Sequence, residues 1–246
     1  MIGSVNSRVL CYSATLSGGK PLQRSGMKAL KSMMVSSGGA TAPEEKSAVL
    51  IIDDDPALRD SLGRLLRSVG LDAHLFASVS DFLSAKCPNA VSCLVLDVRL
   101  PGRSGLDFQR ELAAAKIQLP IIFITGNGDI PMSVLAMKRG AIEFLTKPFR
   151  DHDLLEAIDA GLARDRLRRE NDKALGGLRK RFEALSPRER EIMIEVVRGR
   201  LSKQIAFDLG VSEVTVKVHR SNMMRKMQAA SLPELGRLAD KLNLIS

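Results

Sequence analysis

Residues 48–70 read AVLIIDDDPALRDSLGRLLRSVG, a short apolar run followed at once by a helical pattern. The run at 48–53 predicts a buried strand. The residues after it are apolar at helical spacing and predict one buried helix face: Leu58, Leu62, Leu65, Leu66 and Val69. An apolar strand bounded directly by such a helix is typical of a parallel sheet that helices cover on both faces.

The same alternation continues to about residue 160. Further strands are predicted at 72–76, 92–97, 120–125 and 143–146, with helices at 78–85, 106–116, 131–140 and from about Arg150. Five strands alternating with five helices predict an α/β fold with a five-stranded, doubly wound parallel sheet.

The last third of the chain shows only helical patterns. The helix from about Arg150 becomes heavily charged, as a linker helix does, and Gly176-Gly177 is expected to interrupt it. An all-α domain of four helices follows. Ser186, Ser202 and Ser212 are its predicted N-caps, and glycines 199 and 210 its predicted stops.

The expected organisation has four segments. Residues 1–46 have no sustained period and contain SGG twice, so we expect a flexible extension, of which residues 1–44 are dispensable for folding. The α/β domain is expected at 47–163, a linker helix at 164–181 and the helical domain at 182–246.

Composition excludes several classes of protein. The chain has 246 residues, 45% of them hydrophobic and 26% charged, which suits two globular domains. Its apolar runs fall far short of the roughly 18 residues that cross a bilayer, and no signal peptide is evident, so we expect a cytoplasmic protein without membrane contact. The cysteines Cys11, Cys87 and Cys93 have no metal-ligand spacing and are expected to be reduced.

Charge is distributed unevenly along the chain. The net charge is +9, yet residues 47–163 hold 12 basic and 15 acidic side chains, whereas residues 164–246 hold 19 and 11. A basic C-terminal third suits a polyanion such as DNA. Charge alone leaves a solvated basic surface open as the simpler alternative.

Polar residues stand where the predicted strands end. Because the ligands of a parallel sheet gather beyond the carboxyl ends of its strands, we expect these side chains to share one site. A single aspartate at a strand end is usually a turn residue. Several acidic positions with a hydroxyl and a lysine at one sheet edge favour a site instead: Asp53, Asp54, Asp55, Asp97, Thr125 and Lys147.

Residues 48–163 resemble the receiver domain of two-component response regulators. The resemblance rests on four motifs in the family's order: VLIIDDDP, LVLDVRLPGRSGLD, FITGNGDIPM and EFLTKPF. Asp54 precedes Asp97 by 43 residues, Thr125 follows 28 residues later, and Lys147 comes 22 residues after that. The resemblance implies that Asp97 accepts a phosphoryl group, since an aspartate can act as a nucleophile towards phosphorus.

The resemblance also implies roles for the neighbouring residues. Mg²⁺, which prefers oxygen ligands and water, would be held by Asp53, Asp54, Asp97 and the backbone carbonyl of Arg99. Lys147 and Thr125 would stabilise the phosphoryl group, and the peptide bond before Pro148 would be cis. Thr125 and Phe144 would act as a switch that reshapes a dimerisation surface at 132–139, 143–146 and 151–160.

Residues 182–246 resemble the LuxR-type helix-turn-helix domain of NarL/FixJ-class response regulators. The matching stretches are LSPREREIM and GRLSKQIAFDLGVSEVTVKVHRSNMMRKM. The resemblance implies base contacts by Lys217, Val218 and Ser221. Phosphate contacts are expected from Lys203, Thr215, His219 and Arg225, and the core candidates are Val211, Met223, Met224 and Met227.

These resemblances predict a phosphorylation-controlled, DNA-binding transcriptional regulator. A sensor histidine kinase would phosphorylate Asp97, and a homodimer would bind double-stranded DNA and act with RNA polymerase. The protein would be no enzyme beyond catalysing its own phosphorylation and dephosphorylation. The alternative is a DNA-binding regulator whose receiver is a non-phosphorylated interaction module.

Three other classes fit the sequence less well. An aspartate-dependent phosphatase of haloacid-dehalogenase type would need a second aspartate where Arg99 stands. GNGDIP at 126–131 lacks the third glycine of a dinucleotide motif. A small-molecule-sensing LuxR relative would need a separate ligand domain, and the receiver-like segment leaves no room for one.

Overall fold

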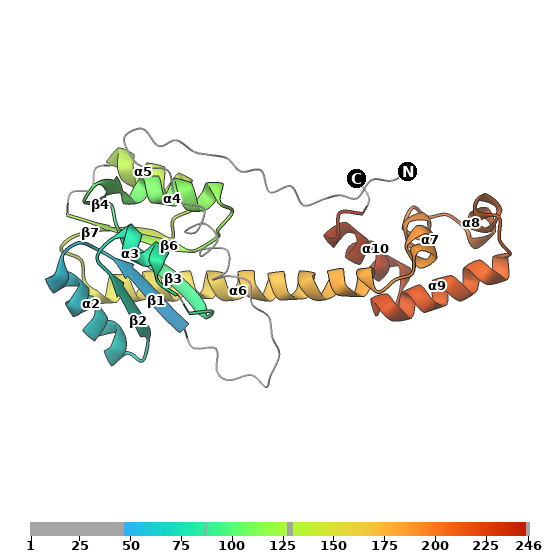
Figure 1. The fold of residues 1–246 in the computed structure, drawn as a ribbon, viewed down its shortest axis with the longest axis horizontal. Coiled ribbons are helices and arrows are strands. Elements are labelled where there is room, and N and C mark those ends of the chain that lie inside the picture. The colour runs from blue at the N-terminus through green and yellow to red at the C-terminus, as the bar shows by residue number, and fades with distance from the viewer. Residues whose placement is uncertain (1–46, 87, 127–129, 245–246) are drawn as a thin grey trace. The chain divides into compact units, whose positions relative to one another are not determined.

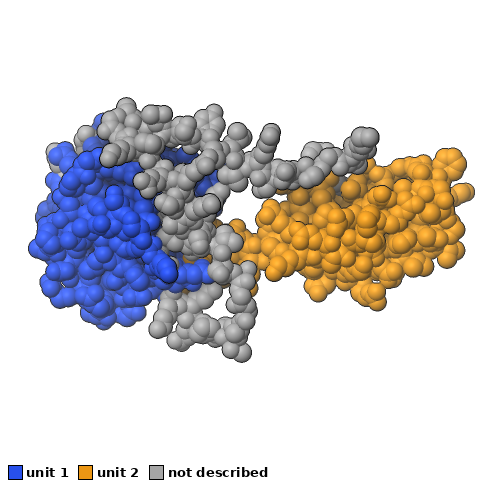
Figure 2. Space-filling model, in the orientation of Figure 1, with its two compact units in different colours: residues 1–165 blue, residues 166–246 orange. Residues whose placement is uncertain are grey.

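The computed structural model describes residues 47–86, 88–126 and 130–244. The extension expected at 1–46 and the thiols of Cys11 and Cys87 therefore lie outside the described residues. The chain divides into two compact units, residues 1–165 and 166–246 (Figure 2). None of the helices in the described part of the chain is long and apolar enough to cross a membrane.

The first unit contains the predicted five-stranded parallel sheet, with the strand order β2-β1-β3-β6-β7. The strands are β1 (Ser47–Ile52), β2 (Asp72–Phe76), β3 (Val91–Asp97), β6 (Ile121–Thr125) and β7 (Glu143–Thr146). The helices that alternate with them are α2 (Pro56–Ser68), α3 (Val79–Ser84), α4 (Gly105–Ala114), α5 (Ile130–Lys138) and α6 (Asp151–Glu183). Figure 1 shows helices on both faces of the sheet, which confirms the predicted doubly wound α/β fold.

Alternate residues of β1 pack in two separate hydrophobic cores, one on each face of the sheet. Val49 and Ile51 pack with buried residues of α2 and α6. Leu50 and Ile52 pack on the opposite face with residues of α3, α4 and α5. Because successive side chains of a strand point to opposite faces, a strand buried on both sides must be apolar throughout, as this one is.

Two local features of this unit differ from the prediction. A short antiparallel pair, β4 (Arg99–Leu100) with β5 (Arg103–Ser104), follows β3. Two-residue strands are too short to leave a periodic pattern in the sequence. Val69, expected on the buried face of α2, instead forms the C-cap and is 50% exposed.

The prediction that Gly176-Gly177 interrupts the linker helix is wrong. Helix α6 is continuous from Asp151 to Glu183. A glycine costs a helix only about 0.5–1 kcal/mol relative to alanine. The buried Leu178 packs in the core of the second unit and helps to hold this turn of the helix. The expected domain limits at 163 and 181 both fall inside α6, so they stay predictions.

The second unit contains the four predicted helices: α7 (Pro187–Val197), α8 (Ser202–Leu209), α9 (Glu213–Met227) and α10 (Leu232–Lys241). Ser186 caps α7 in a reciprocal capping box with Glu189, and Ser212 caps α9. Gly210 ends α8 with a φ of 64°, in the left-handed region that favours glycine.

The predicted cap of α8 is wrong. Leu201, in extended conformation, occupies the N-cap position, and its backbone N–H donates to the side chain of Gln204 at 2.9 Å. The hydroxyl of Ser202 instead accepts a hydrogen bond of 3.0 Å from the guanidinium of Arg220 on α9.

The core of the second unit confirms part of the prediction for α9. Met223 and Met227 are fully buried, as expected, whereas Val211 and Met224 lie half-buried at the edge of the core. The sequence interpretation missed Val216, which is also fully buried.

Arginines from neighbouring helices bind the carboxyl ends of three helices in this unit. Arg181 donates to the carbonyl of Met227 (3.0 Å), Arg188 to that of Leu209 (2.8 Å) and Arg190 to that of Glu183 (2.6 Å). The last carbonyls of a helix have no partner within it, so these guanidinium groups satisfy them from outside.

Candidate functional site

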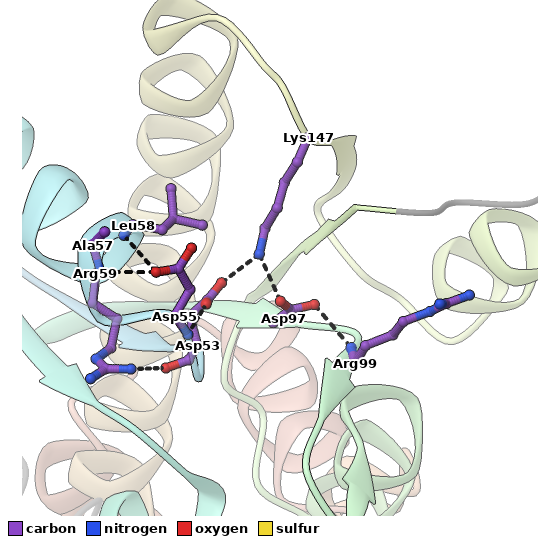
Figure 3. A network of polar contacts seen from close by, with 8 residues as sticks. All are labelled: Asp53, Asp55, Ala57, Leu58, Arg59, Asp97, Arg99 and Lys147. Carbon is purple, nitrogen blue, oxygen red and sulfur yellow. Dashed lines mark hydrogen bonds and ion pairs between the residues drawn. The ribbon is translucent and has the colours of Figure 1, made fainter.

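Three aspartates meet at the carboxyl edge of the sheet. Asp53 follows β1 and Asp97 ends β3, and these two strands are parallel neighbours in register, so both side chains leave the sheet side by side (Figure 3). Both aspartates are buried, whereas Asp54 is exposed. One carboxylate oxygen from each lies within 4.8 Å of the others.

Lys147 joins two of these carboxylates. Its ammonium lies 2.7 Å from Oδ2 of Asp53 and 2.7 Å from Oδ2 of Asp97. The backbone N–H of Lys147 donates to the carbonyl of Thr125 at 2.7 Å, which helps to hold the lysine there. The bond between Lys147 and Pro148 is cis. The cis bond is as the resemblance implied.

The environment favours the charged form of Lys147. Burial alone would lower the pKa of Lys147, but hydrogen bonds from its ammonium to Asp53 and Asp97 raise it above the ordinary value. Burial raises the pKa of Asp53, although Lys147 and the N–H of Asp55 oppose that shift. A protonated lysine therefore sits between the two carboxylates.

The second oxygen of Asp97 has a different partner. Its Oδ1 accepts a hydrogen bond of 2.9 Å from the backbone N–H of Arg99, at the start of β4. The side chain of Arg99 is directed away from the cluster (Figure 3). The role expected of its backbone carbonyl remains a prediction.

The cluster fits a hard divalent cation. Its donors are carboxylate oxygens on two buried side chains and one exposed side chain, Asp54, which leaves the site open to water on that side. Mg²⁺ prefers a few carboxylates together with retained water molecules. The predicted ligands Asp53, Asp54 and Asp97 are thus brought together in a suitable arrangement.

Two residues near the site were missed in the sequence. Arg59 on α2 donates from Nη1 to the backbone carbonyl of Asp53 at 2.5 Å and so holds the turn that carries the acidic pair (Figure 3). Gly105 opens α4 directly against the backbone of Asp97. The only sequence signal for Arg59 was a basic residue on the first turn of α2, and this signal is weak. The sequence held no signal for the close approach of Gly105 to Asp97. Asp55 is the N-cap of α2 and accepts from the N–H of Ala57 at 2.9 Å.

The predicted switch residues lie on neighbouring strands. Thr125 is fully buried at the end of β6, which pairs with β7. Phe144 on β7 is half-buried, and its ring centroid lies 6.2 Å from that of Phe123. Phe144 therefore packs against the core while part of its surface stays accessible.

The expected dimerisation surface is apolar where α5 contributes to it. Its exposed apolar side chains on α5 are Val134 (45%), Leu135 (40%) and Met137 (42%), and Ile130, just before the expected surface, is 79% exposed. Within α5, Ala136 is the buried residue. A helix with so many apolar groups facing water is typical of an interaction surface.

The residues expected to contact DNA lie on or near α9. Lys203, Lys217, Val218, Ser221 and Arg225 are exposed, and Thr215 and His219 are half-buried. Lys217 pairs with Glu213 at 2.9 Å, one helical turn away. The hydroxyl of Thr215 hydrogen-bonds that of Ser212 at 2.8 Å, so it also supports the start of the helix.

Comparisons with known proteins match both units. Residues 49–159 match the response regulator receiver domain, and residues 183–239 match the bacterial regulatory proteins of the luxR family. The chain is 51% identical over 207 residues to Nodulation protein W of Bradyrhizobium diazoefficiens, covering 84% of this chain and 91% of that protein. It is 46% identical over 189 residues to the transcriptional regulatory protein FixJ of Azorhizobium caulinodans, covering 77% and 90%. The solved structure of the response regulator StyR aligns with a TM-score of 0.71 at 46% identity, covering 80% of this chain and 99% of that one.

Proposed function

Because this chain belongs to the NarL/FixJ class of response regulators, which are transcriptional regulators with a receiver and a LuxR-type DNA-binding domain, we propose that phosphorylation of Asp97 controls its binding to DNA. The phosphoryl donor would be a histidine of a sensor kinase. An Asp97 oxygen would attack phosphorus, the phosphorus–nitrogen bond of the phosphohistidine would break, and the histidine would leave with its nitrogen lone pair. The product would be an acyl phosphate on Asp97.

The observation that carries this proposal is the position of Lys147. Phosphoryl transfer depends mainly on positioning and on neutralising the charge of the phosphoryl oxygens. The Lys147 ammonium already lies 2.7 Å from an oxygen of Asp97, next to where the new phosphoryl group would form. We expect this ammonium to pair with a phosphoryl oxygen, and the Thr125 hydroxyl to hydrogen-bond another.

Asp53, Asp54, Asp97 and the carbonyl of Arg99 would hold Mg²⁺, which when bound would supply further positive charge beside the phosphoryl oxygens. The carboxylate cluster supports this role because it offers one exposed and two buried acidic side chains at one place.

The phosphoryl group would alter dimerisation through Thr125 and Phe144. Movement of the Thr125 hydroxyl towards the phosphoryl group would vacate space beside β7, and Phe144 would turn into it. The reshaped surface, with the exposed apolar side chains of α5, would then bind a second copy. Two joined DNA-binding units bind paired half-sites far more tightly than one, and RNA polymerase is the expected partner of the bound dimer.

A phosphorylation assay tests the acceptor. Wild type and Asp97→Asn are incubated with a small phosphodonor and Mg²⁺, and intact masses are compared. We expect a mass gain of one phosphoryl group in wild type alone. The adjacent aspartates give a matched control: Asp54→Ala should weaken Mg²⁺ binding, whereas Asp55→Ala should mainly cost about 1 kcal/mol of stability through the lost N-cap. Equal modification of wild type and Asp97→Asn would reject Asp97 as the acceptor.

A second experiment separates this function from the alternative, a receiver that acts without phosphorylation. Sedimentation and DNA titration should show that phosphorylation raises both the dimer population and the DNA affinity. Thr125→Ala should be phosphorylated yet fail to dimerise. Lys217→Ala should dimerise normally but lose roughly 1–3 kcal/mol in specific DNA binding. Phosphorylated wild type that stays monomeric and binds DNA no better would favour the non-phosphorylated module.

A further inference from the structure

Two valines on α9 are exposed to solvent and are not part of the hydrophobic core of their unit. Val214 is 70% exposed and Val218 is 54% exposed, whereas Val216 between them is fully buried. A β-branched residue is a weaker helix former than alanine, and its apolar side chain contributes no hydrophobic stabilisation while it remains exposed to water. Two such residues one helical turn apart therefore indicate a contact made outside the unit.

These valines share one face of the helix with two polar side chains. Residues 214, 217, 218 and 221 follow the i, i+3, i+4, i+7 spacing of a single helical face. Lys217 and Ser221 on this face are exposed. The first turn is fixed, since the N–H of Thr215 donates to Ser212 at 3.0 Å. The face thus presents an apolar group, a cation, a second apolar group and a hydroxyl in a defined order.

The basic groups around this face favour DNA as its partner. Lys203 and Arg225 are exposed, like Lys217. In a helix-turn-helix, the N-terminal residues of the second helix meet base edges in the major groove. Thymine alone among the four bases presents a methyl group there, and small apolar side chains contact it. The family resemblance assigned base contact to Val218 and left Val214 without a role.

We propose that Val214 is a second specificity-determining residue and that Val214 and Val218 each contact a thymine methyl group. This inference rests on the proposed role of α9 as the recognition helix. Four residues of helix rise by about 6 Å, whereas successive base pairs are about 3.4 Å apart. The two valines therefore meet thymines one or two base-pair steps apart in each half-site.

Removal of single methyl groups from the DNA tests the inference. Full-length protein, treated with phosphodonor and Mg²⁺, selects a binding sequence from random duplexes, and each thymine of that sequence is then replaced by deoxyuridine. Deoxyuridine pairs identically but lacks the methyl group. Two replacements per half-site should each weaken wild-type binding about three- to fivefold, as expected for one buried methyl group. Val214→Ala should lose sensitivity at one of these positions and Val218→Ala at the other.

A valine of similar exposure provides the control. Val69 on the receiver is 50% exposed, and Val69→Ala should keep the wild-type response at every thymine. Val214→Ala should melt at or above the wild-type temperature, because alanine is the better helix former. A Val214→Ala protein as sensitive as wild type to every replacement would overturn this inference and leave the proposed function intact. A protein that selects no sequence would overturn both.

Discussion

Gly105→Ala tests how closely α4 packs against the backbone of the candidate acceptor. A Cβ at this position would lie 2.4 Å from the carbonyl oxygen of Asp97 and 3.1 Å from Cγ of Leu96. A comfortable carbon–oxygen contact is about 3.3 Å, so the helix or the strand would have to move by about 1 Å. The helix cannot move freely, because the N–H of Gly105 donates to the carbonyl of Val98 at 2.9 Å.

Overpacking of this kind costs about 1–3 kcal/mol, and weakening the bond to Val98 adds about 0.5–1.5 kcal/mol. We therefore expect Gly105→Ala to lose about 2–4 kcal/mol of unfolding free energy, which lowers the melting temperature of the receiver unit by roughly 10 °C. Phosphorylation of Asp97 should also slow, because the strain falls on its own carbonyl.

Thermal unfolding followed by circular dichroism measures the loss. Gly176→Ala is the matched control: a Cβ there meets nothing within 4 Å, so the change should be neutral or stabilise the helix by about 0.5–1 kcal/mol. If Gly105→Ala melts like wild type, the close approach of α4 to Asp97 does not constrain the receiver, and the reasoning from this contact is refuted.

Three further predictions concern buried groups. Burial favours the neutral form of Glu189, but hydrogen bonds from Lys226 and the Ser186 N–H lower its pKa below the ordinary 4.5. The stability that the Glu189 charge contributes should therefore be present above pH 4.5 and be lost as pH falls through the lowered pKa. Glu189→Gln lacks this charge and should lose about 1–3 kcal/mol of unfolding free energy at pH 7, measured by urea titration. Burial, together with the nearby charges of Asp165 and Asp159, raises the pKa of the Cys93 thiol to about 12. Iodoacetamide at pH 8 should therefore not modify Cys93 until urea unfolds the chain. Rapid labelling of Cys93 in the native protein would contradict its burial. Gly161→Ala would place a Cβ 3.0 Å from Cβ of Cys93 where α6 crosses β3, and it should cost about 1–3 kcal/mol in thermal unfolding, whereas an unchanged melting temperature would show that α6 can shift.

The parts of the fold that follow from periodicity could be predicted. A strand such as β1, buried on both faces, is apolar throughout, and its end is marked by Asp53, so its limits agree with the sequence pattern to within a residue. The candidate site could also be predicted from the strand pattern, because Asp97 and Lys147 stand at strand ends that a parallel sheet must bring to one edge.

Competing local forces decided the features that could not be predicted. Helix α9 and the turn before it carry apolar residues at 211, 214, 216, 218, 223, 224 and 227, too many for spacing alone to identify the buried face. Packing against α7 and α8 buried Val216 and left Val214 in water. Likewise, the Gly176-Gly177 pair looks like a helix end in isolation, and only the burial of Leu178 reveals why the helix continues.

The arginines that bind helix ends change how the basic C-terminal unit would respond to salt. The guanidinium groups of Arg181, Arg188 and Arg190 are each directed at a carbonyl of their own unit, so we expect them to contribute less than exposed cations to phosphate contacts. The number of counterions released on binding is then set by the exposed cations near α9, namely Lys203, Lys217 and Arg225, and not by the full basic surplus of residues 164–246. Each phosphate neutralised contributes about −0.9 to the slope of log affinity against log salt concentration, so one copy of α9 would account for a slope of about −3. A regulator of this kind would keep more of its specific affinity as ionic strength rises than the basic surplus of residues 164–246 suggests, because Arg181, Arg188 and Arg190 are held at the ends of its own helices.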